Sequence, residues 1–154
     1  MFSLIIEFAN VLLAALLVGA MFGAWLILNP AGLSASSYVA LQQQSIRALN
    51  KTMPVLGAIV IVFTVFAAVL GRDNSMRFGL LLATLACFVA AGLVTRFLNQ
   101  PINAIVITWN SAAPPANWAD LRDRWWRWHL TRLAAGLAGL CLLILATLQR
   151  KWIG

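Results

Sequence analysis

Residues 53–70 read MPVLGAIVIVFTVFAAVL, an apolar run that contains no charged side chain. A helix that crosses the hydrocarbon core of a bilayer needs about 20 apolar residues, within a range of about 17–25. Further runs of this kind occupy residues 3–28, 76–98 and 130–148. The sequence therefore predicts an all-α integral membrane protein, a four-helix bundle that forms a single transmembrane domain over residues 1–154.

The overall composition supports this prediction. Hydrophobic residues make up 62% of the chain and charged residues 10%, whereas a soluble domain averages about 45–50% and about 25%. This balance excludes an ordinary soluble domain, a disordered tail and a disulfide-stapled secreted module. A net charge of +7 would suggest nucleic-acid binding in a soluble protein. Basic residues beside membrane spans explain the charge here, so we expect a lipid bilayer and no nucleic acid as partner.

The first apolar run is interpreted as a retained span and not as a signal peptide. It is longer than an h-region of about 7–15 residues, and the first basic side chain of the chain is Arg47. Four spans place both termini on one side of the membrane. Setting aside Arg96, Arg122 and Arg132 as site candidates leaves four basic residues on each side. We expect a bacterial inner membrane protein with cytoplasmic termini.

The two long connections are expected to form a structured cap at the opposite end. In residues 34–51, Ser34 is placed to cap an interfacial helix, or an extension of the second span, with a glutamine-rich polar side. Residues 99–117 form a long connection that contains several apolar side chains, so we do not expect disorder. Most of the tryptophans gather at this end: Trp25, Trp109, Trp118, Trp125, Trp126 and Trp128.

Helical spacing places five large side chains on one face of the helix that leads into the fourth span. Asn117 is the expected N-cap, and each residue turns the helix by about 100°. Within an arc of about 80° lie Trp118, Arg122, Trp125, His129 and Arg132, followed by Gly136. One interpretation is an interfacial helix with snorkelling arginines and membrane-belt tryptophans. The other is a ligand site on the interior of the bundle, because buried ionisable groups in membranes are costly and functional.

Fewer polar residues remain elsewhere in the spans. Arg96, Asn99 and Asn103 follow i, i+3, i+7 spacing at the exit of the third span, where Pro101 is expected to kink or end the helix. The two asparagines either pair with backbone groups near this break or face a substrate. Glu7 is expected to reach the interface on the terminal side, far from the aromatic face. With one histidine and no cysteines at ligand spacing, we expect no metal and no cofactor.

Four segments of this chain are similar to those of a known family. They are LLVGAMFGAWLILNP (16–30), ALNKTMP (48–54), LNQPIN (98–103) and WADLRDRWWRWHLTRL (118–133). The chain resembles the anthrone-oxygenase-like family of small four-span membrane proteins. The resemblance implies a monooxygenase that converts an anthrone to an anthraquinone with O₂ and needs no metal or flavin. A related phenol, hydroquinone or other lipid-phase aromatic is an equally compatible ligand, and a homo-oligomer is compatible with the sequence.

The resemblance also implies roles for the residues. His129 is the candidate general base, because its ordinary pKa lies near neutrality. Arg132 or Arg96 would stabilise the enolate oxygen. Substrate contacts are assigned to Trp118, Arg122, Trp125, Asn99 and Asn103, with the indoles stacking on aromatic rings and the asparagines hydrogen-bonding a carbonyl or phenol.

Two other classes of function compete with an oxygenase. A small proton-coupled exporter of aromatic compounds would use Glu7 as its carrier carboxylate. The cationic cluster disfavours a cationic cargo and favours an anionic or phenolic one. A non-catalytic scaffold or lipid-binding subunit would instead turn Trp118, Trp125 and His129 toward the lipid, with no closed pocket beneath them.

Overall fold

The structure is a computed structural model, and it describes residues 1–29 and 32–149. Every regular element in these residues is helical, which confirms the all-α class. The elements are α1 (Phe2–Ile27), α2 (Ala35–Leu49), α3 (Thr52–Leu70), α4 (Ser75–Val94), the π-helical turn η1 (Thr95–Asn99), α5 (Gln100–Val106) and α6 (Trp118–Leu148). Pro30 at the end of the first apolar run, the basic residues Arg150 and Lys151 of the terminal side, and Trp152 lie outside the described residues.

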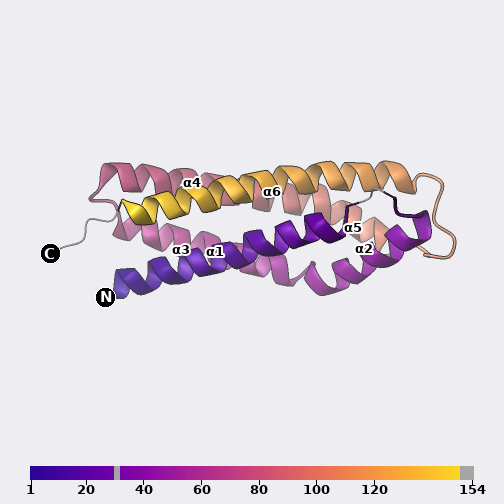
Figure 1. The fold of residues 1–154 in the computed structure, drawn as a ribbon, viewed down its shortest axis with the longest axis horizontal. Coiled ribbons are helices and arrows are strands. Elements are labelled where there is room, and N and C mark those ends of the chain that lie inside the picture. The colour runs from indigo at the N-terminus through magenta and orange to yellow at the C-terminus, as the bar shows by residue number, and fades with distance from the viewer. Residues whose placement is uncertain (30–31, 150–154) are drawn as a thin grey trace.

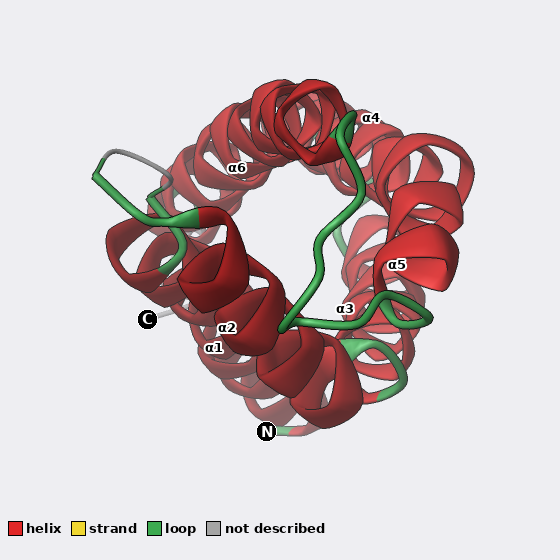
Figure 2. Cartoon of the chain, turned by 90° about the vertical axis from the view of Figure 1, so that its right-hand side faces the viewer, coloured by secondary structure: helices red, strands yellow, loops and turns green. Residues whose placement is uncertain are grey.

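Four helices are long and apolar enough to cross a membrane: α1, α3, the continuous helix Ser75–Val106 and α6. They contact one another in the order α1, α3, α4, α6 and back to α1, so α3 and α6 lie diagonally across the bundle (Figure 2). The first residues of α1 and the last residues of α6 lie at one end of the bundle (Figure 1). The opposite end carries α2, α5 and the loop that leads to α6.

The third span does not end at Pro101, where the sequence suggested a break. The helix passes through η1, in which the Gln100 N–H bonds the Thr95 carbonyl, and continues to Val106. Pro101 closely follows the π turn, and local π geometry is one way in which a membrane-spanning helix pairs the backbone groups that a proline leaves free. The loop before α6 is therefore shorter than expected, and the π turn, a feature frequent at functional sites, carries Arg96 and Asn99.

The expected cap over one end of the bundle is confirmed. Ser34 Oγ accepts a hydrogen bond from the Ser37 N–H (3.2 Å) and starts α2. Gln43 of α2 donates from Nε2 to the carbonyls of Val106 (3.0 Å) and Trp109 (2.8 Å), so α2 holds the loop across the end of the bundle (Figure 2). An apolar cluster lies beneath this loop and contains Leu28, Ile46, Ile102, Val106 and Trp125, with Trp109, Trp126 and Trp128 packed against it.

Glu7 is buried at the end of the bundle that carries the first residues of α1, with 7% of its surface exposed. Arg77 of α4 donates from Nη2 to Glu7 Oε1 at 2.7 Å. The paired cation explains the burial, because a buried carboxylate is stable in an apolar interior only when it is paired or hydrogen-bonded. The ion pair joins α1 to α4 far from the aromatic face of α6.

Candidate functional site

The part of the predicted α6 face that lies farther along the helix from Trp118 points into the interior of the bundle. Trp125 is 4% exposed and His129 is fully buried. A Cβ added to Gly136 would lie 2.6 Å from Met21 Cε, and one added to Gly139 would lie 3.0 Å from Phe88 Cε1. The two glycines therefore let α1 and α4 pack closely below the aromatic residues. This arrangement removes the lipid-facing interpretation for Trp125 and His129.

Trp118 and Arg122 lie on the same face at the start of α6 and belong to the cap. The Trp118 ring packs on Tyr38 of α2, with the ring centroids 5.8 Å apart. The Arg122 guanidinium lies 4.7 Å from the Trp118 ring centroid, and its Nε donates to Asp123 Oδ1 at 2.8 Å. Neither residue lines a cavity described below. Tyr38 is buried by this packing, and burial raises the pKa of its phenol well above the ordinary value.

His129 and Arg132 form a directly bonded pair. Arg132 donates to His129 Nδ1 from Nε (3.1 Å) and from Nη2 (2.9 Å), and Nη1 lies 3.5 Å from Thr95 Oγ1 on the π turn. A histidine whose Nδ1 accepts from arginine carries its proton on Nε2. The imidazole stacks on Trp125, with ring centroids 5.0 Å apart and planes 5° apart. The indole and the guanidinium together fix the orientation of the histidine.

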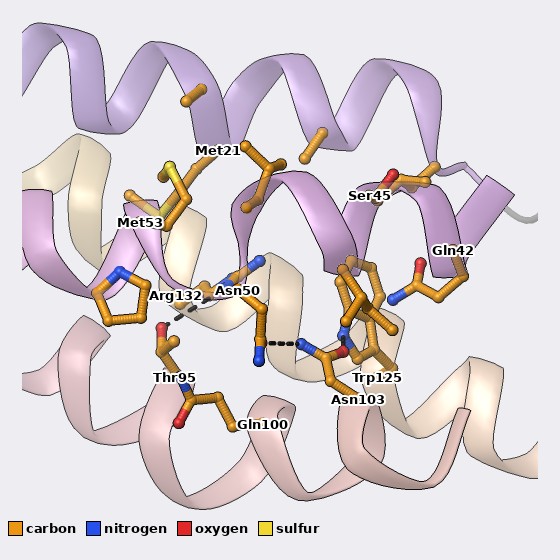
Figure 3. Close-up of a pocket in the computed structure, with 16 residues that line it drawn as sticks. Met21, Gln42, Ser45, Asn50, Met53, Thr95, Gln100, Asn103, Trp125 and Arg132 are labelled. Carbon is orange, nitrogen blue, oxygen red and sulfur yellow. Dashed lines mark hydrogen bonds between the residues drawn. The ribbon is translucent and has the colours of Figure 1, made fainter. Parts of the chain in front are cut away.

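Two adjoining cavities meet at Arg132. The smaller cavity, about 40 Å³, is called the polar cavity because its lining includes the side chains of Gln42, Asn50 and Asn103 (Figure 3). It lies toward the cap. The apolar cavity is larger, about 190 Å³, and lies deeper in the bundle. Residues that line both are Met21, Met53, Pro54, Thr95, Gln100 and Arg132. His129 lines neither cavity, so the Arg132 side chain stands between the imidazole Nδ1 and the cavities.

A chain of side-chain hydrogen bonds organises the polar cavity. Trp125 Nε1 donates to Asn103 Oδ1 (2.8 Å), and Asn103 Nδ2 donates to Asn50 Oδ1 (3.0 Å; Figure 3). These bonds connect α6 and α5 to the junction of α2 and α3. Gln42, which is 1% exposed, also lines this cavity, and its Oε1 has no hydrogen-bond partner in the described part of the chain. The cavity therefore presents amide groups that a polar ligand atom can use.

The two asparagines of the third span have different positions. Asn99 is fully buried, and its Nδ2 donates to the Trp125 carbonyl at 3.1 Å. It therefore pairs with backbone, whereas Asn103 lines the polar cavity. Arg96 is exposed and lines only the apolar cavity. Thr95, Gln100 and Gln42 also line the cavities, although no sequence pattern predicted the first two, and only the glutamine-rich side of α2 pointed to Gln42.

Acidic and metal-binding side chains are scarce around this site. Among residues 1–29 and 32–149, no group of three or more His, Cys, Asp and Glu side chains could hold a metal ion. The ionisable groups closest to the cavities are the cations Arg96 and Arg132. The site is therefore suited to an uncharged or anionic ligand.

Comparison with known proteins adds one finding. A family model described as anthrone oxygenase matches residues 43–142, more than half of the chain. The matched segment includes Asn50, Asn103, Trp125, His129 and Arg132, and it leaves out the α1 wall of the cavities. No curated protein and no solved structure matches the chain.

Proposed function

Because this chain belongs to the anthrone oxygenase family, we propose that it oxidises a hydrophobic aromatic substrate of the anthrone or phenol type with O₂ and without a cofactor. The observation that carries the proposal is the position of Arg132, a cation on the wall between an apolar and a polar cavity. A guanidinium in an apolar surrounding strongly stabilises an enolate or phenolate oxygen. Formation of that anion is the step that makes such a substrate reactive toward O₂.

The reaction balances without an added reductant. An anthrone loses one methylene proton to a base, and the resulting enolate transfers one electron to O₂. The two radicals combine to a peroxide at the same carbon. Loss of the second proton with cleavage of the O–O bond forms the quinone carbonyl and water. One anthrone and one O₂ thus give one anthraquinone and one water, with all four electrons supplied by the substrate.

His129 is proposed as the base that takes the first proton, which passes from the methylene to the enol hydroxyl by tautomerisation and is removed from the oxygen beside Arg132. In the resting arrangement Nδ1 is occupied by two donors from Arg132. When Arg132 turns to the oxygen of the bound substrate, Nδ1 loses these donors and becomes free to accept a proton. The substrate anion then favours the imidazolium form. This order of events links the availability of the base to the presence of substrate.

In substrates that carry a further phenol hydroxyl, the polar cavity is proposed to hold that hydroxyl. Asn103 and Asn50 are already hydrogen-bonded to each other, and such chains polarise the groups at their ends. Trp125 offers an indole face beside them, which suits stacking on an aromatic ring. Arg96 is a second candidate for the enolate oxygen, while Trp118 and Arg122 are proposed to close the cap above the site.

The observed geometry gives less support to the competing functions. An exporter needs a carboxylate that is free to exchange protons, and Glu7 is buried in an ion pair with Arg77. A purely structural subunit would not require a cation between two cavities. We therefore propose no second function.

The direct test uses oxygen-18 gas and purified protein in lipid nanodiscs. With anthrone as substrate, we expect anthraquinone that carries one labelled oxygen atom, formed faster than in empty nanodiscs. Arg132→Gln is the matched control, because it keeps hydrogen-bonding capacity but removes the charge. Product formation at the rate of empty nanodiscs would overturn the proposal for anthrone. Equal rates for the wild type and Arg132→Gln would remove Arg132 from the mechanism.

A further inference from the structure

We propose that the apolar cavity takes its ligand sideways from the bilayer, through a window between α3 and α4, and that the ligand is a phenol with an apolar tail. The window is formed by Gly57 and Ala58 of α3 and Gly92 of α4. In this arrangement the hydroxyl lies at Arg132 and the tail remains in the window. The inference rests on the proposed function in taking Arg132 as the anchor for the ligand oxygen.

The exposure of the lining residues locates the opening. Leu17 and Met21, the α1 residues of the cavity wall, are buried. Ala58, Gly92 and Arg96 line the same cavity and are exposed, and they lie on α3 and α4. The cavity therefore reaches the surface of the bundle between these two helices.

Glycine at positions 57 and 92 keeps this window open, because glycine has no side chain to fill it. A Cβ added to Gly57 or to Gly92 would meet no atom within 4 Å. The neighbouring residues on the outer surface are large and apolar, with Val55 60%, Ile59 40% and Leu93 52% exposed. In a membrane-spanning bundle such a surface faces lipid. The window therefore connects the cavity to the bilayer, and a lipid-soluble compound can enter without crossing the cap.

The volume of the cavity limits what it can enclose. An engineered cavity of about 150 Å³ in another protein binds benzene, and the apolar cavity here measures about 190 Å³. One aromatic ring fits inside, and further rings or an alkyl chain must extend through the window. The interior then holds the ring, while the lipid solvates the rest of the ligand.

The arrangement of the helices orients the ligand. Arg132 lies on α6, diagonal to α3 across the bundle, and α3 forms one edge of the window. A ring whose hydroxyl contacts Arg132 therefore directs its opposite edge toward the window. A tail para to the hydroxyl passes through the window, whereas a tail ortho to the hydroxyl is directed into the wall beside Arg132.

The experiment compares two isomers of nearly equal lipid solubility, tritiated 4-nonylphenol and 2-nonylphenol. Binding to the protein in nanodiscs is measured by scintillation proximity, with empty nanodiscs subtracted. Gly92→Leu fills the window. Gly79→Leu is the matched control, because Gly79 lies on the same helix, is exposed, and also has no atom within 4 Å of an added Cβ. Melting temperatures verify that both variants fold, and leucine is a better helix former than glycine.

We expect 4-nonylphenol to bind at least about tenfold more tightly than 2-nonylphenol. Gly92→Leu should remove this preference, and Gly79→Leu should keep it. Equal binding of the two isomers to the wild type, or a preference that survives in folded Gly92→Leu, would overturn the inference. The assay needs no turnover. Isomer-selective binding with no oxygen consumption would uphold the window and reject the oxygenase function. Oxidation of anthrone without isomer-selective binding would uphold the oxygenase function and reject the window.

Discussion

Arg132 places two of its nitrogens on one atom of His129, with Nε at 3.1 Å and Nη2 at 2.9 Å from Nδ1. The contact joins a fully buried imidazole to a side chain that lines both cavities. His129 therefore affects the cavities through Arg132. A glutamine at position 129 can accept the hydrogen bonds of Arg132 but cannot act as a general base. The two roles of His129 can therefore be separated.

Replacing His129 by glutamine or by alanine should distinguish these roles. If His129 is the base, both His129→Gln and His129→Ala lose turnover by about 10²–10⁴-fold, the range typical of a general base. Ligand binding should survive in His129→Gln, because the Gln amide oxygen still accepts from Arg132. Steady-state oxygen uptake measures turnover, and the phenol binding assay measures the site. Near-normal turnover in His129→Gln would reduce His129 to a positioning residue.

Replacing Arg132 should affect both binding and chemistry. Arg132→Lys keeps a positive charge but loses the planar fork that spans His129 and Thr95. We expect turnover to fall by about 10²–10³-fold in Arg132→Gln, as when an oxyanion donor is removed, and by less in Arg132→Lys. Arg124→Gln is the control, because Arg124 lies on the same helix and is exposed. Equal losses in Arg124→Gln and Arg132→Gln would indicate a general effect of charge.

The spans and the shared face of α6 were predictable because both depend on local periodicity, whereas the direction in which that face points was left open. Runs of apolar residues define the four spans, and the 3.6-residue repeat places Trp125, His129 and Arg132 on one side. That Trp118 and Arg122 line neither cavity was not predictable in this way. It depends on where α2 packs Tyr38, which is a tertiary contact.

The cavities and the pairing of Glu7 depend on contacts between distant segments. Arg77 lies far along the chain from Glu7, and no local pattern connects them. The continuation of the third span past Pro101 requires a π turn, for which residues 95–99 contain no simple signal. The proposed window depends on Gly57 and Gly92, which line the same cavity from adjacent helices, a relation that only the packing defines.

The hydrogen bonds of Asn103 should stabilise the capped end. Asn103→Leu removes the bonds to Trp125 and Asn50 and leaves the buried Trp125 indole N–H and the half-buried Asn50 Oδ1 without these partners. Each unpaired group costs about 1–3 kcal/mol, so the melting temperature should fall by several degrees. Asn117→Leu is the control, because Asn117 is exposed and its side chain makes no capping bond to α6. An unchanged melting temperature for Asn103→Leu, measured by circular dichroism in detergent, would contradict this role.

The Glu7–Arg77 ion pair should show strong coupling in a double-mutant cycle. Glu7→Gln or Arg77→Met alone leaves a buried charge without its partner, which costs about 3–5 kcal/mol. The double variant removes both charges and should regain most of that loss. The free energy of unfolding in detergent, measured for all four proteins, gives the coupling. Additive losses would show that the two side chains interact weakly. Unchanged oxidation by the double variant would show that the ion pair has no part in the reaction.

Tyr38 should resist ionisation in alkali. It is the only tyrosine in the chain, so the ultraviolet absorbance of tyrosinate reports on it alone. Burial raises the pKa of the phenol above its ordinary value of 10.0, and the nearby Arg122 cation only partly offsets this effect. The pKa of Tyr38 is higher in the folded than in the unfolded protein, so the buried neutral phenol contributes to stability relative to tyrosinate. This contribution is complete below about pH 10 and is lost as the pH rises through the folded pKa.

The measurement is an alkaline titration of folded protein beside protein unfolded in denaturant. The unfolded chain should ionise near its ordinary pKa, and the folded chain only at higher pH. Tyr38→Phe is the control for the signal. It should also melt at or above the temperature of the wild type, because the buried Tyr38 hydroxyl has no hydrogen-bond partner among the described residues and its removal relieves the cost of burying it. Coincident titration of the folded and unfolded chains would mean that Trp118 and α2 do not bury the phenol, and the packing of the cap would have to be revised.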